Sequence, residues 1–200
     1  GRTVHPTGIE GLEDCRLFRW LDSWWVTATV RDSTPEGTAR VMLGRLDAEG
    51  DDVVIRKVVE LPSPHAILHE KNWAPFVVGD EMHLLYRWHP RRVMRWDGTN
   101  LTVLSERAGD AEQLDWRGSS QGARVAGGWL FVVHEVSAAN AGRRYLHRFV
   151  RVGDDGGVRW SPAFTFTGTP VEFAAGLAVN SDIVVVSFGV NDATAALAVL

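Results

Sequence analysis

The sequence has a single cysteine, Cys15, among its 200 residues. One thiol cannot form an internal disulfide, and it excludes a zinc site built from paired cysteines. A chain without disulfides fits a reducing compartment best, so we predict a cytoplasmic location. A secreted protein without disulfides is the alternative.

Long apolar runs and an excess of basic residues are also missing. The longest apolar run, 183–190, has the length of a strand and falls well short of the roughly 20 residues that cross a bilayer. Lysine and arginine number 21 and aspartate and glutamate 25, which gives a formal net charge of −4. Nucleic-acid-binding domains usually carry a basic excess, and membrane-surface proteins carry a basic amphipathic helix. We therefore predict that neither nucleic acid nor a membrane is a partner.

Glycine and tryptophan, in contrast, are abundant, with 20 and 9 residues. Short runs rich in Val, Ile, Trp, Phe and Thr alternate with Gly, Asp, Asn and Pro, a pattern typical of strands and turns. Helical periodicity is almost absent, which predicts an all-β protein. The expected hairpins pair 17–20 with 24–30, 39–46 with 53–61, 75–78 with 83–88, 93–96 with 101–104, 123–125 with 129–136, 145–152 with 158–160, and 173–179 with 183–190, and a last strand covers 193–199.

A polar or small-residue motif precedes an apolar hairpin four times along the chain. The four motifs are Gly-Leu-Glu-Asp-Cys-Arg at 11–16, Glu-Lys-Asn-Trp-Ala-Pro-Phe at 70–76, Arg-Gly-Ser-Ser-Gln-Gly at 117–122, and Glu-Phe-Ala-Ala-Gly at 172–176. Their spacing of roughly 50 residues predicts a β-propeller with four-stranded blades. Residues 1–200 then form one domain, in which the innermost strands bring the four motifs to a central funnel. A β-sandwich is the alternative.

The first motif contains adjacent carboxylates, Glu13 and Asp14, beside Arg16. Neighbouring residues of a strand point to opposite faces, so only one of the two acids can face a given site. A carboxyl group in a partly apolar pocket can keep its proton near neutral pH and act as a general acid. An ordinary turn with an ion pair to Arg16 would explain the same residues.

The second motif combines Lys71 and Asn72 with a large aromatic residue, Trp73. Tryptophan faces stack on the C–H surfaces of sugars, and the lysine and asparagine can bind hydroxyl groups or an anion. Placement of Trp73 in the core is equally compatible with the pattern. Further along, Arg87 and His89 end a strand and could hold a phosphate or carboxylate, although surface charge at a hairpin end explains them as well.

The remaining motifs indicate no nucleotide or metal site. The 117–122 loop lacks the spacing and the following Lys-Ser/Thr of a P-loop. His134 is followed directly by Glu135, but a lone His-Glu pair without the helical HExxH pattern does not hold a metal. Asp192 follows an apolar run and could hydrogen-bond sugar hydroxyls, or simply form a turn. We therefore predict no metal and no cofactor.

Taken in order, these motifs resemble those of the five-bladed propellers of glycoside hydrolase family 130, which comprises mannoside phosphorylases and their hydrolytic relatives within a family 43-like superfamily. Residues 11–16 resemble the family's Gly-x-Glu-Asp-Pro-Arg motif, with Cys15 in place of proline. Residues 70–76 resemble its Asp-Lys-Asp-Ala-Ala-Leu-Phe-Pro segment, and 84–90 its Leu-His-Arg-Pro, with two extra residues. Residues 129–136 resemble its Gly-Trp-Leu-x-x-Tyr-His-Gly-Val strand, and 188–192 its closing Tyr-Gly-Ala-Ala-Asp.

The resemblance implies roles for individual residues. Asp14 matches the family's general acid, which protonates the leaving oxygen through a sugar hydroxyl while phosphate or water attacks the anomeric carbon with inversion. Lys71 matches a phosphate-binding lysine, and Arg87 and His89 belong to the rearranged element that would also hold phosphate. The substrate-binding positions implied or predicted are Glu13, Arg16, Asn72, Trp73, His134 and Asp192.

The resemblance also implies a substrate class and a blade count. The expected partner is an oligosaccharide or glycoside, mannoside-like, with inorganic phosphate as a possible co-substrate of an inverting phosphorylase or hydrolase. The alternatives are a glycan-binding or scaffold propeller without catalysis and a propeller associated with glycosyl transfer. Four units of roughly 50 residues fill the 200-residue chain, whereas the family has five blades. The missing piece is expected at the N-terminus, and the ring is expected to be open or completed from elsewhere.

Overall fold

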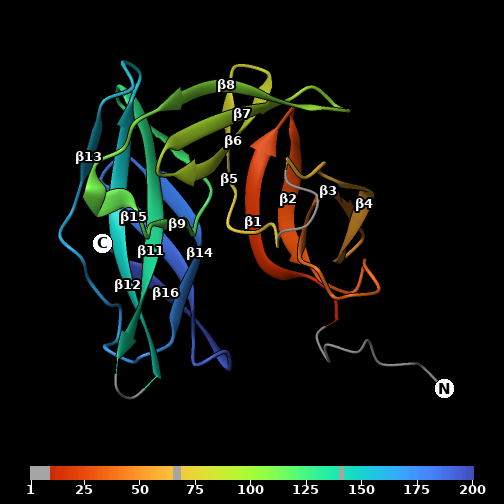
Figure 1. The fold of residues 1–200 in the computed structure, drawn as a ribbon. Helices are drawn as coiled ribbons and strands as arrows, with labels where there is room; N and C mark the ends of the chain where they lie inside the picture. Colours follow the sequence, from red (N-terminus) through yellow and green to blue (C-terminus); the bar gives the residue numbers. More distant parts are fainter. Residues whose placement is uncertain (1–9, 65–68, 140–141) are drawn as a thin grey trace.

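The computed structural model describes residues 10–64, 69–139 and 142–200, and it is built almost entirely of β-strands (Figure 1). The strands form four antiparallel sheets that follow one another along the chain. The first sheet contains β1 (Glu13–Trp20), β2 (Ser23–Val30), β3 (Arg40–Glu49) and β4 (Asp52–Glu60). The second contains β5 (Ala74–Val78), β6 (Glu81–Trp88), β7 (Arg91–Trp96) and β8 (Leu101–Arg107).

The third and fourth sheets complete the described structure. A short 3₁₀ helix, Ala111–Gln113, leads into the third sheet, whose strands are β9 (Arg117–Gly118), β10 (Ala123–Val125), β11 (Gly128–Ala139), β12 (Gly142–Gly153) and β13 (Val158–Trp160). The fourth contains β14 (Glu172–Asn180), β15 (Ile183–Val190) and β16 (Thr194–Val199). In the first, second and fourth sheets the strands pair in chain order, and in the third β10 to β13 do so while β9 also pairs with β11. The leading strands lie innermost, which is the arrangement of propeller blades. The predicted all-β propeller with about four blades is confirmed, and the β-sandwich alternative is wrong.

Tight turns account for the short connections between the strands. Leu21 and Asp22, between β1 and β2, both have positive φ, of 47° and 55°. Asn191 and Asp192, between β15 and β16, have φ of 53° and 52°. Two consecutive positive-φ residues form the turn whose twist matches that of the flanking strands, and Asn and Asp adopt this conformation at little cost. The second of these turns fixes the position of Asp192.

The core is divided among three clusters, each centred between two consecutive sheets. The first unites Phe18 and Leu43 of the first sheet with Met82 and Leu84 of the second. The second joins Phe76 and Trp88 to Phe131 and Val150 of the third sheet, and the third joins Val132 to Ala174, Leu177, Val186 and Phe188 of the fourth. Apolar packing of one sheet on the next therefore holds the blades together. Within the described residues, no helix is long and apolar enough to cross a membrane.

Candidate active site

The polar motifs meet where the innermost strands begin. Asp14 lies near the start of β1, Lys71 directly before β5, and Arg117 at the start of β9. The charges of Lys71 and Asp192 both act on the Asp14 carboxyl group, and those of Asp14 and Arg117 act on the Lys71 amine. Residues from all four blades thus share one electrostatic environment at this end of the propeller.

Asp14 owes its position to an irregularity in β1. The pairing of β1 with β2 shifts register between Glu13 and Arg16, and Asp14 has φ of 53°. Such a bulge redirects a side chain and is common beside functional sites. Burial raises the pKa of the Asp14 carboxyl above its usual value, with Glu13 and Asp192 adding to the rise and Arg16 and Lys71 opposing it. Asp14 therefore has the environment of a carboxyl group that retains its proton more readily than an exposed aspartate.

Arg16 is buried, with only 2% of its surface exposed, and all of its donor bonds go to backbone carbonyls. Its Nε donates to the carbonyl of Ser119 at 2.6 Å, and its two terminal nitrogens donate to Asp14 at 2.8 Å and to Gly118 at 3.2 Å. The guanidinium thus ties the bulge of β1 to the loop that carries Arg117. Arg16 supports the site from the interior, because each of its three nitrogens already donates to a backbone carbonyl and its side chain is buried.

Lys71 and Arg117 line two neighbouring surface depressions. One, of about 270 Å³, is also lined by Asn72, Tyr86 and Arg87. The other, of about 530 Å³, is also lined by Ser137, Arg143 and Tyr145. Partial burial lowers the pKa of Lys71, as do the charges of Arg31 and Arg117, whereas Asp14 and Glu13 raise it. Lys71 and Arg117 lie where the two depressions adjoin, with Arg87 in one depression and Arg143 in the other. This border, the cationic edge, is suited to binding an anion.

Two more of the predicted substrate contacts, Trp73 and His134, are buried side chains. Trp73 is 2% exposed, packs in the cluster between the first two sheets, and donates its indole N–H to Glu70 at 3.2 Å. The sequence was equally compatible with a sugar-binding surface and with core placement of Trp73, and the structure shows the core placement. His134 is also 2% exposed; its Nδ1 lies 2.7 Å from the Ser119 hydroxyl, and burial holds its pKa well below the usual value. Trp73 and His134 thus support the site from inside the blades.

The other predicted residues lie at or near the surface. Glu13 forms an ion pair with Arg31 at 3.2 Å, and Arg87 forms one with Glu106 at 3.4 Å. His89, followed by a cis peptide bond to Pro90, is half-buried and lines neither of the two depressions. Asn72 and Arg87 therefore share a depression with Lys71, and the charges of Lys71 and Asp192 act on Asp14, whereas His89 lies outside both depressions.

Sequence reasoning missed Arg117, Arg143 and Tyr145 as candidates. Arg117 occupies the start of the third motif, the position that corresponds to the polar starts of the others, and this periodicity could have identified it. Arg143 and Tyr145 lie on β12, which is not an innermost strand, and nothing in the sequence marks them. No group of three or more His, Cys, Asp or Glu side chains suitable for a metal ion occurs among the residues that the structure describes.

Comparison with solved structures identifies the architecture. A Bacteroides ovatus protein provisionally assigned as a glycoside hydrolase superposes with a TM-score of 0.66 at 14% identity, over 94% of this chain and 68% of the other. The fold is a glycosidase-type β-propeller. A GDP-mannose-dependent mannosyltransferase from Leishmania mexicana matches with a TM-score of 0.57 at 12% identity, over 94% of this chain and 68% of the other. A mannose phosphorylase from the same organism, solved with phosphate, matches with 0.53 at 10%, over 92% and 65%.

The chain thus spans about two thirds of the length of these structures. No protein-family model matches the sequence, and no curated protein matches it significantly.

Proposed function

We propose that this chain is the propeller of a carbohydrate-active enzyme that cleaves, phosphorolyses or transfers a glycosyl unit, as do proteins of the family 130 type. The observation that carries the proposal is the convergence of Asp14, a carboxyl group whose pKa burial raises, with the cationic edge at Lys71 and Arg117. The likeness to glycosidase-type propellers supports it, since these include enzymes that act on mannose derivatives. The proposed substrate is a mannoside-like glycoside.

In the proposed reaction, Asp14 is the general acid. Its proton passes to the leaving glycosidic oxygen, either directly or through a sugar hydroxyl, as the bond from that oxygen to the anomeric carbon breaks. An oxygen of phosphate, or of a water molecule that releases a proton to solvent, attacks the same carbon from the opposite face, which inverts its configuration. The raised pKa of Asp14 serves this step, because a general acid must hold its proton at the working pH.

The cationic edge would hold the anionic reactant. A phosphate oxygen can accept charge-assisted hydrogen bonds from Lys71 and Arg117, and Arg143 and Arg87 lie in the two adjoining depressions. A sugar phosphate or a sugar nucleotide presents the same chemistry. Phosphorolysis and transfer from a phosphorylated donor therefore both make use of this edge, whereas hydrolysis does not require it.

The test incubates the purified protein with a panel of mannosides, with and without inorganic phosphate, and with GDP-mannose and an acceptor sugar. Sugar 1-phosphate formed only with added phosphate identifies a phosphorylase, free sugar a hydrolase, and a longer glycan a transferase. Saturable glycan binding without turnover in any assay would contradict the proposal and favour a glycan-binding propeller.

Asp14→Asn is the decisive variant, because asparagine also accepts positive φ and removes only the acid. Turnover is expected to fall by about 10²–10⁴-fold, the usual contribution of a general acid. Asp22→Asn, at another positive-φ aspartate that is fully exposed, is the matched control and should retain activity. In the parent protein, activity should decline as the pH rises through the raised pKa of Asp14.

Stability separates loss of the acid from loss of the fold. Because the pKa of Asp14 is raised on folding, its stabilising contribution is complete below the unfolded value and is lost as the pH rises through the folded value. Asp14→Asn should therefore unfold at a denaturant concentration at least as high as that of the parent at neutral pH. Loss of turnover together with lower stability would point to a structural defect.

A further inference from the structure

The residue that precedes Lys71 in the sequence, Glu70, is a buried carboxylate with only 5% of its surface exposed. Its Oε1 accepts hydrogen bonds from the Ser63 hydroxyl at 2.8 Å and from the Tyr86 hydroxyl at 3.1 Å. Its Oε2 accepts one from the indole N–H of Trp73 at 3.2 Å. Hydrogen bonds to a charged acceptor are stronger than those between neutral groups, so one carboxylate fixes three side chains from separate segments.

The bond from Trp73 to Glu70 closes a short turn with Lys71 and Asn72 at its tip. Glu70 and Trp73 are both buried, whereas Lys71 reaches the surface and Asn72 is half-buried. The backbone N–H of Glu70 also donates to the carbonyl of Ala39 at 2.9 Å. The turn is therefore anchored in the interior at both ends, while Lys71 and Asn72 line the smaller depression of the cationic edge.

The same carboxylate holds a further residue of that depression, Tyr86 on β6. The Tyr86 ring packs edge-on against Trp73, with 5.2 Å between the ring centroids. Burial, together with the charge of Glu70 and the hydrogen bond to it, raises the pKa of Tyr86 to about 12. The hydroxyl thus keeps the proton that it donates to Glu70, and this bond joins β6 to the turn that carries Lys71.

Glu70 is connected to Lys71 through position more than through charge. Burial lowers the pKa of the Lys71 amine, and the charges that act on it most are those of Arg31, Asp14, Arg117 and Glu13. The adjacent Glu70 is not among them, because its side chain is buried whereas that of Lys71 reaches the surface. A shorter side chain at position 70 should therefore release the turn, whereas a neutral one of equal length should leave the charge around Lys71 nearly unchanged.

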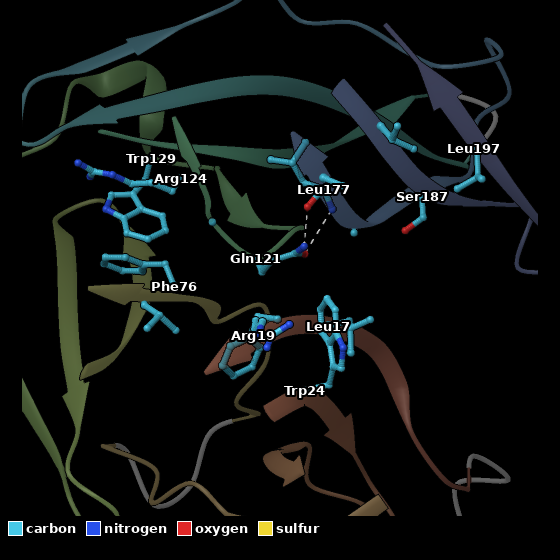
Figure 2. A pocket seen from close by; sticks show the side chains of 16 residues that line it. Leu17, Arg19, Trp24, Phe76, Gln121, Arg124, Trp129, Leu177, Ser187 and Leu197 are labelled. Atoms are coloured by element: carbon cyan, nitrogen blue, oxygen red, sulfur yellow. Dashed lines mark hydrogen bonds between the residues drawn. The ribbon is translucent and has the colours of Figure 1, made fainter. Parts of the chain in front are cut away.

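A separate groove of about 660 Å³ offers an anion less favourable surroundings than the cationic edge. It is lined largely by apolar side chains of all four sheets (Figure 2). Its two arginines are already paired with aspartates, Arg19 with Asp22 at 3.8 Å and Arg124 with Asp154 at 2.5 Å. Since neither arginine carries an uncompensated charge, we expect phosphate to bind at the edge that contains Lys71 and not in this groove.

We infer that Glu70 is a positioning residue of the cationic edge, and that its hydrogen bonds to Trp73 and Tyr86 set the affinity of the edge for phosphate by holding Lys71 in place. Glu70 lines neither depression, so it acts through its neighbours and does not touch the anion. The inference rests on the proposed function in one respect, since it takes the edge as the binding site of an anionic reactant.

Two variants separate the reach of Glu70 from its charge. In Glu70→Gln, the amide oxygen can accept from the Trp73 indole, and the amide nitrogen can donate to the hydroxyls of Ser63 and Tyr86, which are able to turn and accept. Glu70→Asp keeps the charge but is one methylene shorter, so it cannot reach all three donors. Isothermal titration calorimetry with inorganic phosphate then measures the Kd of each folded protein. Glu70→Asp should bind phosphate at least about tenfold more weakly than the parent, and Glu70→Gln should retain most of the affinity.

Two control variants show where phosphate binds and whether lower stability alone weakens its binding. Glu172→Asp is the same substitution at another buried glutamate, which lies on the fourth sheet and lines neither depression. It should lower stability and leave the Kd for phosphate unchanged. Lys71→Met should abolish the binding.

Parent affinity in Glu70→Asp would overturn the inference, even in a less stable protein, because the role of Glu70 would then be purely structural. Retention by Glu70→Asp with loss in Glu70→Gln would also overturn it, because the charge would then be what matters. If the parent binds no phosphate, or Lys71→Met binds it equally well, the inference fails together with the proposed anion site, whereas the turnover assays still judge the role of Asp14. Should Glu70→Asp not fold, Ser63→Ala removes one donor outside both depressions, and unchanged affinity in that variant would overturn the inference.

Discussion

Replacement of Arg16 by methionine tests whether one buried guanidinium joins the first blade to the third at the site. The substitution keeps the length and apolar stem of the side chain but removes every donor to the carbonyls of Asp14, Gly118 and Ser119. These three oxygens are then left without the donor that satisfies them. We therefore expect a loss of stability that is large compared with that of a surface substitution.

The magnitude follows from two opposing contributions. A hydrogen bond that involves a charged group contributes about 1.5–3 kcal/mol, so three lost bonds represent roughly 5–9 kcal/mol. Burial of the charged guanidinium opposes this, because it lowers the pKa of Arg16 to about 10, which corresponds to a cost of about 3 kcal/mol that methionine does not carry. The net destabilisation expected is about 2–6 kcal/mol, a substantial part of a typical domain's stability.

Urea unfolding followed by tryptophan fluorescence measures the effect, and the nine tryptophans provide the signal. Arg16→Lys, which retains the charge but not the planar array of donors, should lose less stability than Arg16→Met. Arg159→Met, an exposed arginine on β13, is the control and should change stability by less than about 0.5 kcal/mol. An Arg16→Met protein as stable as the parent would refute the role assigned to this residue.

Two further predictions concern packing beside the site. Glu172 is fully buried and accepts hydrogen bonds from Phe166, Thr167 and Thr169. Because an amide supplies only one acceptor oxygen, Glu172→Gln should lower the free energy of unfolding, measured in urea, by about 2–3 kcal/mol. Burial acts to raise the pKa of Glu172, but these hydrogen bonds lower it overall. The parent protein should therefore lose stability as the pH falls below about 4.5. An equally steep loss of stability at acid pH in Glu172→Gln would contradict this. Gly118→Ala would place a Cβ 2.3 Å from the backbone oxygen of Asn72. We expect the free energy of unfolding to fall by about 1–3 kcal/mol and phosphate to bind more weakly, because the loop that carries Lys71 is displaced. Unchanged stability and phosphate binding would contradict this.

Much of the fold could be predicted from the sequence because strands and tight turns are determined by residues close together in the chain. Alternating apolar residues separated by Gly, Asp and Asn locate hairpins such as β1–β2 and β14–β15, and the recurrence of polar motifs at roughly 50 residues indicates blades. The predicted ends of strands were less accurate: β1 begins at Glu13 rather than Leu17, because a bulge carries the acidic motif into the strand.

The candidate site was less predictable because its members are far apart in sequence. Asp14 and Lys71 were identified by the chemistry of their motifs, but Arg117 and Arg143 become candidates only when the blades bring them beside Lys71. Residue type alone also gave no indication of burial: Trp73 resembles a sugar platform in the sequence and packs in the core.

The sequence by itself determined an all-β chain, its approximate number of blades, and the acidic and basic residues available for chemistry. These follow from local alternation, turn residues and periodicity. Only the tertiary structure decided that the guanidinium of Arg16 is enclosed by backbone carbonyls, that cationic groups of different blades share one edge, and that residues of all four sheets line one groove. Burial, electrostatic coupling and the pairing of sheet faces depend on distances between remote segments, and those distances exist only after the blades have packed.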